Sequence, residues 1–323
     1  MNVFSNPLSN PKMNEPIEVD SKQNEVEVGD VFFTTSSETP KEVGMTSVLI
    51  EKQGKMYLNS FCFGYRLYEK YDSYYLAYMF RSSSFREKII LLAQGISRYN
   101  ISKNKVMEID VFIPSYKEQI QIGKYFRDID TLITLHQRKL DKLINVKKSM
   151  LEKMFPKQGG TVPEVRFGGF TEDWEQRKLG EIATEMVAGG DIDKDLILDE
   201  GRYPVIANAL TNDGIVGYYN EDYRIKAPAV TITGRGDVGH AKARIVDFTP
   251  IVRLLSLKSN HDVFFLENAI NTLKIVIEST GVPQLTVPQL TKYEISFPKS
   301  LDEEEKIGVC FKQLDNLITL HQR

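Results

Sequence analysis

Apolar residues recur at alternating spacings of four and three between residues 122 and 154, interrupted only by one histidine and one lysine. This spacing is typical of a coiled-coil seam and predicts one long helix over residues 115–156. Pro114 and Pro156 stand at its two ends, where proline often starts or stops a helix. A helix of this length exceeds what a single globular core requires, so its seam is expected to have a partner helix.

The heptapeptide LITLHQR occurs twice, at 132–138 and at 317–323, and the similarity continues upstream of both copies. A period of 185 residues is too long for a solenoid repeat and indicates a duplicated domain, each copy ending in the same helix. The second helix is predicted over 299–323. We expect the two helices to pair in antiparallel through Ile129, Ile133, Leu140 and Leu143 on the first and Phe311, Leu314 and Ile318 on the second. His136 and His321 occupy equivalent seam positions and are interpreted as a polar layer that sets the register.

Segments of a different character precede each helix. Residues 28–68 and 204–248 alternate β-branched and aromatic residues with Gly, Asn and Asp, which predicts short strands joined by turns. A Gly- and Pro-rich stretch at 157–173 marks a boundary between the two units. The chain is therefore predicted to be an α+β protein with two strand-rich domains, over 1–114 and 174–298, separated by long antiparallel coiled-coil helices.

Composition narrows the class of protein. The 323 residues suggest about two domains. No run is long and apolar enough for a membrane span, and the N-terminus lacks the order of a signal peptide, so a cytoplasmic protein without a membrane partner is expected. The two cysteines lie far apart with no CxxC partner, which argues against a disulfide framework and against a thiolate zinc site.

The net charge of −3 hides two basic windows. Residues 55–105 hold nine Lys or Arg against three acidic residues, and residues 224–258 hold seven against two. Two separate basic windows are compatible with two sites for an anionic ligand such as DNA or RNA.

The motif GRGDVG at 234–239 has the spacing of a dinucleotide fingerprint, but the residues after it have β character and include a proline, so it does not open a helix. A glycine-rich turn that brings the backbone close to a phosphate, with Arg235, His240 and Lys242 beside it, fits the pattern better. No Walker A run, nucleophile elbow or metal-ligand cluster is present in the sequence. We therefore expect no catalytic residues, no metal and no cofactor of the chain's own.

WEQRKLGEIA (174–183), TITGRGDVGHA (231–241), GVPQLTVPQLTKYEISFP (281–298) and the helix containing LITLHQR closely resemble the specificity subunit of type I restriction-modification systems, over nearly the whole chain. The resemblance implies two target-recognition domains that each read half of a split sequence in double-stranded DNA, held apart by an antiparallel helical spacer. It also implies that two methyltransferase subunits dock on the helices and supply the chemistry, and that restriction subunits join through that core.

The resemblance also points to the residues that face DNA. In the second domain these are Asn208, Thr211, Asn212, Thr233, Arg235, Gly236, Asp237, His240, Lys242, Arg244 and Gln284, with Arg235, Lys242 and Arg244 as phosphate or guanine contacts. In the first domain they are Arg98, Tyr99 and Asn100.

The chain departs from the family pattern at both ends. The first domain has no counterpart of WEQRKLG, and its first 16 residues show no strand pattern, so we expect this domain to be incomplete. The first helix continues to residue 155, whereas the second stops at 323. We expect this difference to leave an exposed apolar surface, and hence self-association, at Met150, Leu151, Met154 and Phe155.

Two other functions are compatible with parts of the sequence. A scaffold of two protein-binding modules on a coiled coil explains the heptads and the acidity, but not the concentration of Gly, Arg, Lys and Asn in turns. A methyltransferase fused to its reader lacks an Asn-Pro-Pro motif, since the only Asn-Pro pairs are at 6–7 and 10–11. Salt titration of DNA binding tests the first alternative, and methyl transfer by the isolated chain tests the second.

Overall fold

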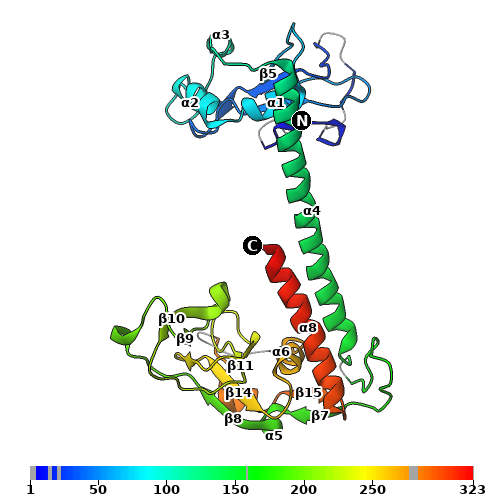
Figure 1. Ribbon diagram of the computed structural model, residues 1–323, viewed down its shortest axis with the longest axis vertical. Helices are drawn as coiled ribbons and strands as arrows, with labels where there is room; N and C mark the ends of the chain where they lie inside the picture. The colour runs from blue at the N-terminus through cyan, green and yellow to red at the C-terminus, as the bar shows by residue number, and fades with distance from the viewer. Residues whose placement is uncertain (1–4, 14–16, 20–22, 158, 276–282, 323) are drawn as a thin grey trace. The chain divides into compact units, whose positions relative to one another are not determined.

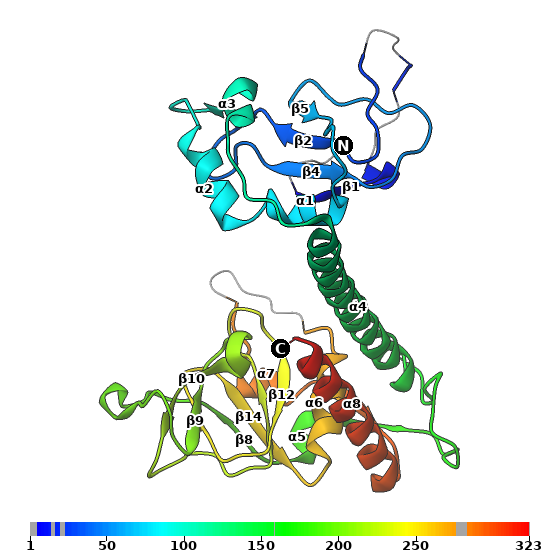
Figure 2. The same ribbon diagram turned by 45° about the horizontal axis from the view of Figure 1, so that its top comes forward.

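A computed structural model describes residues 5–13, 17–19, 23–157, 159–275 and 283–322 (Figure 1 and Figure 2). The chain forms two compact units, Met1–Leu135 and His136–Arg323, and the boundary between them falls inside helix α4 (Tyr116–Met154). The two predicted long helices are present, as α4 and as α8 (Leu301–Gln322). The α+β fold class is confirmed.

The first unit is built on a four-stranded sheet in the order β1-β4-β2-β5. The central strand β2 (Val31–Thr34) pairs in antiparallel with β4 (Thr46–Leu49) and with β5 (Cys62–Tyr65). Strand β1 (Leu8–Ser9) pairs in parallel with β4. The expectation that the first 16 residues contain no strand is therefore wrong. A two-residue strand is held by backbone hydrogen bonds and is too short to show a side-chain alternation in the sequence.

Two helices cover the core of this sheet. Helix α1 (Ser73–Met79) and helix α2 (Ser83–Leu91) contribute buried side chains to the same apolar cluster as β2 and β4. Within that cluster the ring of Phe33 stacks on the ring of Phe63, with centroids 5.4 Å apart. The remaining elements are η1 (Pro11–Met13), α3 (Lys103–Met107) and a ribbon of β3 (Ser36–Ser37) and β6 (Tyr99–Asn100).

The second unit contains two larger sheets and a ribbon. One sheet has the order β12-β11-β14-β8, the other β10-β9-β13, and the ribbon is β15-β7. The strands are β7 (Glu175–Lys178), β8 (Ala183–Ala188), β9 (Tyr203–Ile206), β10 (Ile215–Tyr219), β11 (Ala229–Ile232), β12 (Ala241–Arg244), β13 (Thr249–Pro250), β14 (Leu255–Ser259) and β15 (Glu294–Phe297). The short helices are α5 (Leu179–Ile182), η2 (Lys194–Leu196), η3 (Thr211–Gly214), α6 (Val263–Asn271) and α7 (Val287–Leu290). Helix α6 packs on both α8 and the sheet that contains β11.

The two units share one packing arrangement, which supports the duplication seen in the sequence. In the first, the carboxylate of Asp72 accepts a hydrogen bond at the start of α1 and lies against Gly123 of α4. In the second, the carboxylate of Asp262 does the same at the start of α6, against Gly308 of α8. A Cβ at either glycine would lie about 2 Å from the capping oxygen, 2.2 Å in one unit and 2.0 Å in the other. Each long helix therefore needs glycine where a capped helix crosses it closely.

Within the second unit, α4 and α8 run antiparallel, as predicted. Moving forward along α4, His136 contacts His321, Lys147 pairs with Asp315 at 2.5 Å, and Phe155 packs on Phe311 with ring centroids 6.0 Å apart. The partner numbers fall as the α4 numbers rise, which defines an antiparallel pair.

The expected exposure at the end of α4 is wrong. Met154 and Phe155 are buried in the main core of the second unit, and Met150 and Leu151 pack against it. In an antiparallel pair the residues after His136 face the residues before His321, all of which the chain contains. Ile133, which was expected in the interface, is instead 61% exposed.

The Gly- and Pro-rich stretch after α4 is fastened to the second unit. The guanidinium of Arg166 donates two hydrogen bonds to the buried carboxylate of Glu303, at 2.7 and 2.8 Å. Phe167 packs against the core, and the backbone N–H of Val165 donates to the carbonyl of Lys153 at 2.9 Å. Residues 159–173 of this stretch therefore belong to the second unit.

Candidate nucleic-acid interface

The GRGDVG motif lies in the connection between β11 and β12. Thr233 closes this turn: its backbone N–H donates to the carbonyl of His240 at 3.0 Å, and its hydroxyl accepts from the N–H of His240 at 2.9 Å and donates to the carbonyl of Asp237. Thr233 is buried. Thr233, one of the predicted DNA contacts, thus stabilises the turn through hydrogen bonds within the protein.

Gly234 is the point where three other loops meet this turn. Its N–H donates to the side-chain oxygen of Asn208 at 2.8 Å, and its carbonyl accepts from the N–H of Leu285 at 2.9 Å. A Cβ on Gly234 would lie 2.2 Å from the carbonyl oxygen of Arg253. The amide nitrogen of Asn208 in turn donates to the carbonyl of Val252 at 3.0 Å. Asn208 therefore joins backbone segments, with its amide oxygen and nitrogen both engaged inside the protein.

Arg253 is a residue of this loop cluster that the motif analysis missed. It has a left-handed backbone, with φ of +71°, which is uncommon for a residue other than glycine. Its guanidinium donates to the side-chain oxygen of Gln284, a predicted DNA contact. The only sequence signal for Arg253 was its place in the second basic window.

The exposed tip of the turn carries the unpaired positive charge. Arg235, Gly236 and Asp237 are all exposed, and no described residue forms a hydrogen bond or ion pair with the side chain of Arg235. Gly236 has a φ of +73° with open space around it. The structure therefore presents Arg235 on a turn whose backbone is accessible to a ligand.

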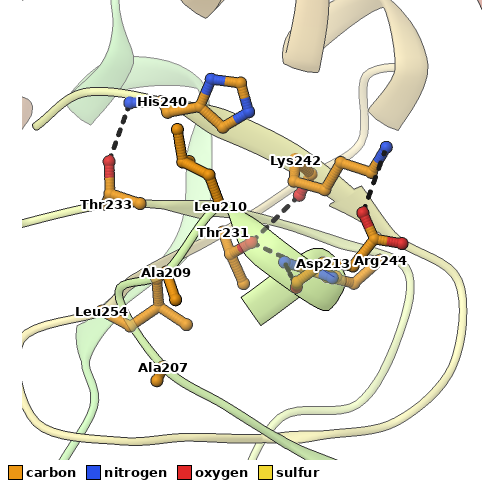
Figure 3. Close-up of a pocket in the computed structure, with 10 residues that line it drawn as sticks. All are labelled: Ala207, Ala209, Leu210, Asp213, Thr231, Thr233, His240, Lys242, Arg244 and Leu254. Carbon is orange, nitrogen blue, oxygen red and sulfur yellow. Dashed lines mark hydrogen bonds and ion pairs between the residues drawn. The ribbon is translucent and has the colours of Figure 1, made fainter. Parts of the chain in front are cut away.

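Behind the turn, β12 supplies two more cations, in a small pocket of about 30 Å³ (Figure 3). The ammonium of Lys242 lies 3.9 Å from carboxylate oxygens of both Asp213 and Glu267. Arg244 donates from Nε to the hydroxyl of Thr231 and from Nη2 to the carbonyl of Asp213, each at 2.9 Å. Burial lowers the pKa of Arg244. Arg244 is thus held in place by the protein, whereas Lys242 is partly exposed and faces the pocket.

His240 lines the same pocket (Figure 3). Desolvation of its ring lowers the pKa of His240, the nearby cations Lys242 and Arg244 lower it further, and Asp237 opposes them. A lowered pKa favours the neutral imidazole, which both donates and accepts hydrogen bonds at neutral pH.

The loop at 211–214 borders this pocket. Asn212 and Asp213 have left-handed backbones with φ of +50° and +51°, a conformation that Asn and Asp adopt more readily than most residues. Asn212 donates from its amide to the carbonyl of Ile215 at 3.1 Å, and Thr211 is exposed. The second-unit residues predicted from the sequence therefore gather in one cluster of loops.

The candidates in the first unit lie on the β3–β6 ribbon. Arg98 donates to the hydroxyl of Ser36 at 3.1 and 3.2 Å, and Arg98 and Asn100 are exposed, whereas Tyr99 is half-buried. Two arginines of the first basic window have structural roles instead, since Arg81 donates to the carbonyl of Thr46 and Arg86 to three carbonyls between residues 41 and 44. Burial lowers the pKa of Arg81 to about 10.

Within the described part of the chain, no three His, Cys, Asp or Glu side chains are grouped to hold a metal ion. Over the same residues, no helix has both the length and the apolar character that a membrane crossing requires.

Known proteins share both the sequence pattern and the fold. A putative type I specificity subunit of Mycoplasma pneumoniae is 24% identical over 234 residues, which cover 68% of this chain and 58% of the relative. The putative type I restriction enzyme MjaX specificity subunit of Methanocaldococcus jannaschii is 25% identical over 278 residues, which cover 79% of this chain and 64% of the relative. The chain thus spans less than two thirds of the length of these relatives.

Solved structures agree on the fold. The crystal structure of the type I restriction-modification S subunit from M. genitalium superposes with a TM-score of 0.64 at 15% identity, covering 98% of this chain and 84% of that one. A chain from a structural study of complex assembly in a type I restriction-modification system gives 0.55 at 16% identity, covering 92% and 76%.

The family model for the type I restriction modification DNA specificity domain matches twice, over residues 1–145 and 171–323. Each match ends in one copy of the repeated helix, so the duplication in the sequence corresponds to two family domains. The chain therefore belongs to the family of type I restriction-modification DNA specificity domains.

Proposed function

We propose that this chain is the DNA-recognition subunit of a type I restriction-modification complex and directs partner subunits to a bipartite target in the cytoplasm. The observation that carries the proposal is the cluster of loops around Gly234, which presents an unpaired Arg235 together with Lys242 and His240. Unpaired guanidinium groups bind phosphate or the O6 and N7 atoms of guanine, and backbone N–H groups in an open turn bind phosphate. A scaffold with two protein-binding modules does not require this arrangement.

Salt dependence of DNA binding tests the role of Arg235. In the complex assembled with the methyltransferase subunit, Arg235→Ala should weaken DNA binding and reduce the slope of log affinity against log salt by about 0.9, the value for one lost phosphate contact. Arg177→Ala is the matched control, because Arg177 is also exposed but pairs with Glu175 on strand β7. Equal slopes for the wild type and Arg235→Ala would contradict the assignment.

Two methyltransferase subunits are the proposed partners. Leu132 and Leu135 on α4 are exposed, and so are their repeat equivalents Leu317 and Leu320 on α8. Each helix therefore offers the same apolar pair, which suits two copies of one partner. Restriction subunits would join this assembly.

Native mass spectrometry of the assembled complex tests this stoichiometry. We expect two methyltransferase copies with the wild-type chain and one copy with either Leu132→Asp or Leu317→Asp. Val162→Asp, a change at an exposed apolar residue outside both helices, should retain two copies. Retention of two copies by both helix variants would refute the proposed docking sites.

Methylation mapping tests the division of labour. The purified chain is expected neither to methylate nor to cut DNA, because reading DNA needs only base and phosphate contacts, whereas methyl transfer needs a cofactor site and an acid-base constellation. After co-expression with the methyltransferase, the half-site read by residues 174–298 should be specified and the other half relaxed. A fully specified bipartite motif would show that the first unit also reads DNA, and methylation by the chain alone would overturn the proposal.

A further inference from the structure

His136 and His321 are the same residue of the two repeats, and in the second unit they face each other. Their Nδ1 atoms are 3.4 Å apart, and the ring centroids are 5.5 Å apart. A residue contacts its own repeat equivalent only at the local twofold axis of an antiparallel pair. The two imidazoles therefore lie at the point where the repeated LITLHQR segments of α4 and α8 cross that axis.

The separation of the two nitrogens matches a metal coordination sphere better than a hydrogen bond. Hydrogen bonds between nitrogen and its acceptor usually measure about 2.7–3.2 Å, so 3.4 Å is long for one. Zinc binds histidine nitrogen at about 2.0–2.1 Å in tetrahedral geometry, which places two ligand nitrogens about 3.3–3.4 Å apart. The observed distance equals this tetrahedral edge.

We propose that His136 and His321 form a two-histidine site for a late divalent transition metal, with Zn²⁺ as the ion and water completing its coordination. Each imidazole would donate the Nδ1 lone pair and leave its Nε2–H to solvent, and the ion would link the last turn of α8 to α4. This inference is independent of DNA recognition, because the two histidines lie outside the loop cluster around Gly234.

The pair supplies two ligand nitrogens and no more. Metal ions bind the neutral imidazole, so the metal competes with protons for both rings. The part of the chain that the structure describes supplies no third His, Cys, Asp or Glu ligand at this point. A site with two protein ligands leaves the other coordination positions to water. Its affinity for Cu²⁺ should exceed its affinity for Zn²⁺, as is usual for nitrogen ligands.

Calorimetric titration of the untagged, metal-stripped full chain with Zn²⁺ tests the site. The chain has four histidines, and the two seam histidines are compared with His240, which lies outside the seam. We expect one Zn²⁺ per chain, at least tenfold weaker binding in both His136→Gln and His321→Gln, and unchanged metal binding in His240→Gln. Zinc should also raise the melting temperature of the wild type, but not that of the two seam variants. Circular dichroism of each variant without metal shows that it is folded.

The proposal requires the histidine on α8 to lie at position 321, opposite His136. The double variant His321→Gln with Leu320→His keeps a histidine on α8 but moves it to an exposed position, and it should bind Zn²⁺ as weakly as His321→Gln alone. Electron paramagnetic resonance of the Cu²⁺-loaded chain should show two imidazole nitrogens in the wild type and fewer in either single variant. Absence of saturable binding, or binding that survives both seam variants, would overturn the proposal.

Discussion

Replacing Gly234 with alanine should weaken DNA binding through the loop cluster without unfolding the second unit. The added Cβ would lie 2.2 Å from the carbonyl oxygen of Arg253 and 3.0 Å from that of Leu285. Backbone atoms cannot rotate away, so the turn must shift by roughly 1 Å to restore van der Waals contact. That shift strains two hydrogen bonds, from Gly234 to Asn208 and from Leu285 to Gly234.

The size of the effect follows from those two bonds. Each contributes about 0.5–1.5 kcal/mol net, so we expect a loss of about 1–3 kcal/mol, which corresponds to roughly 5- to 150-fold in an equilibrium constant. Because the displaced residues carry the proposed contacts, part of this loss should be seen as weaker DNA binding, measured by fluorescence anisotropy on the assembled complex. Thermal denaturation measures the remainder as a lower melting temperature.

Two other glycines serve as controls for this substitution. Gly168 has open space around it and no left-handed backbone, so Gly168→Ala should change neither binding nor melting temperature. Gly236 also has open space but has a φ of +73°, so Gly236→Ala isolates the cost of a left-handed alanine, about 1–2 kcal/mol. If Gly234→Ala behaved like Gly168→Ala in both assays, the close approach of the three loops would be refuted.

Other predictions concern stability and pH. Phe311→Ala should lower the free energy of unfolding, measured by urea titration, by about 3–5 kcal/mol, because the fully buried ring of Phe311 packs on Phe155. Leu320→Ala, at an exposed position, should change it by less than about 0.5 kcal/mol. Similar unfolding midpoints for the two variants would contradict the core assignment. The pKa of His240 is lower in the folded chain than in the unfolded chain, so the unfolded state binds more protons and stability falls as pH drops below about 6.5. His240→Gln should lose less stability than the wild type between pH 7 and pH 5, and parallel curves would count against a lowered pKa.

The sequence by itself determined the two long helices, the duplication and the family. The heptad spacing at 122–154 indicated helix α4, and the flanking Pro114 and Pro156 placed its ends within two residues, because a seam of apolar side chains has a period that survives without any tertiary contact. The repeated LITLHQR indicated two related domains, and the structure adds an equivalent pair of glycines, Gly123 and Gly308, each crossed closely by a capped helix. Motifs such as GRGDVG also located the turn that presents Arg235.

Tertiary structure decided which of the predicted DNA contacts have side chains available for a ligand. Asn208, Thr233 and Arg244 have the composition of DNA contacts, yet their polar atoms bond to the protein itself. Arg253, which carries no motif, enters the cluster through a left-handed backbone that only the packed loops define. Hydrogen bonds between residues far apart in the chain form only where the sheets bring their loops together. The local sequence around each residue does not indicate which loops will meet.

Tertiary structure also shows what holds the register of the two long helices. The heptads alone suit several registers that differ by whole heptads, and the two histidines interpreted as the register-setting layer, His136 and His321, are in contact. Phe155 and Phe311 meet because α6 and Trp174 complete one core around them, and this core fixes α8 against the end of α4. A periodic pattern specifies which face of a helix is buried, whereas the choice among equivalent positions along that face depends on the globular domain to which the helix is attached.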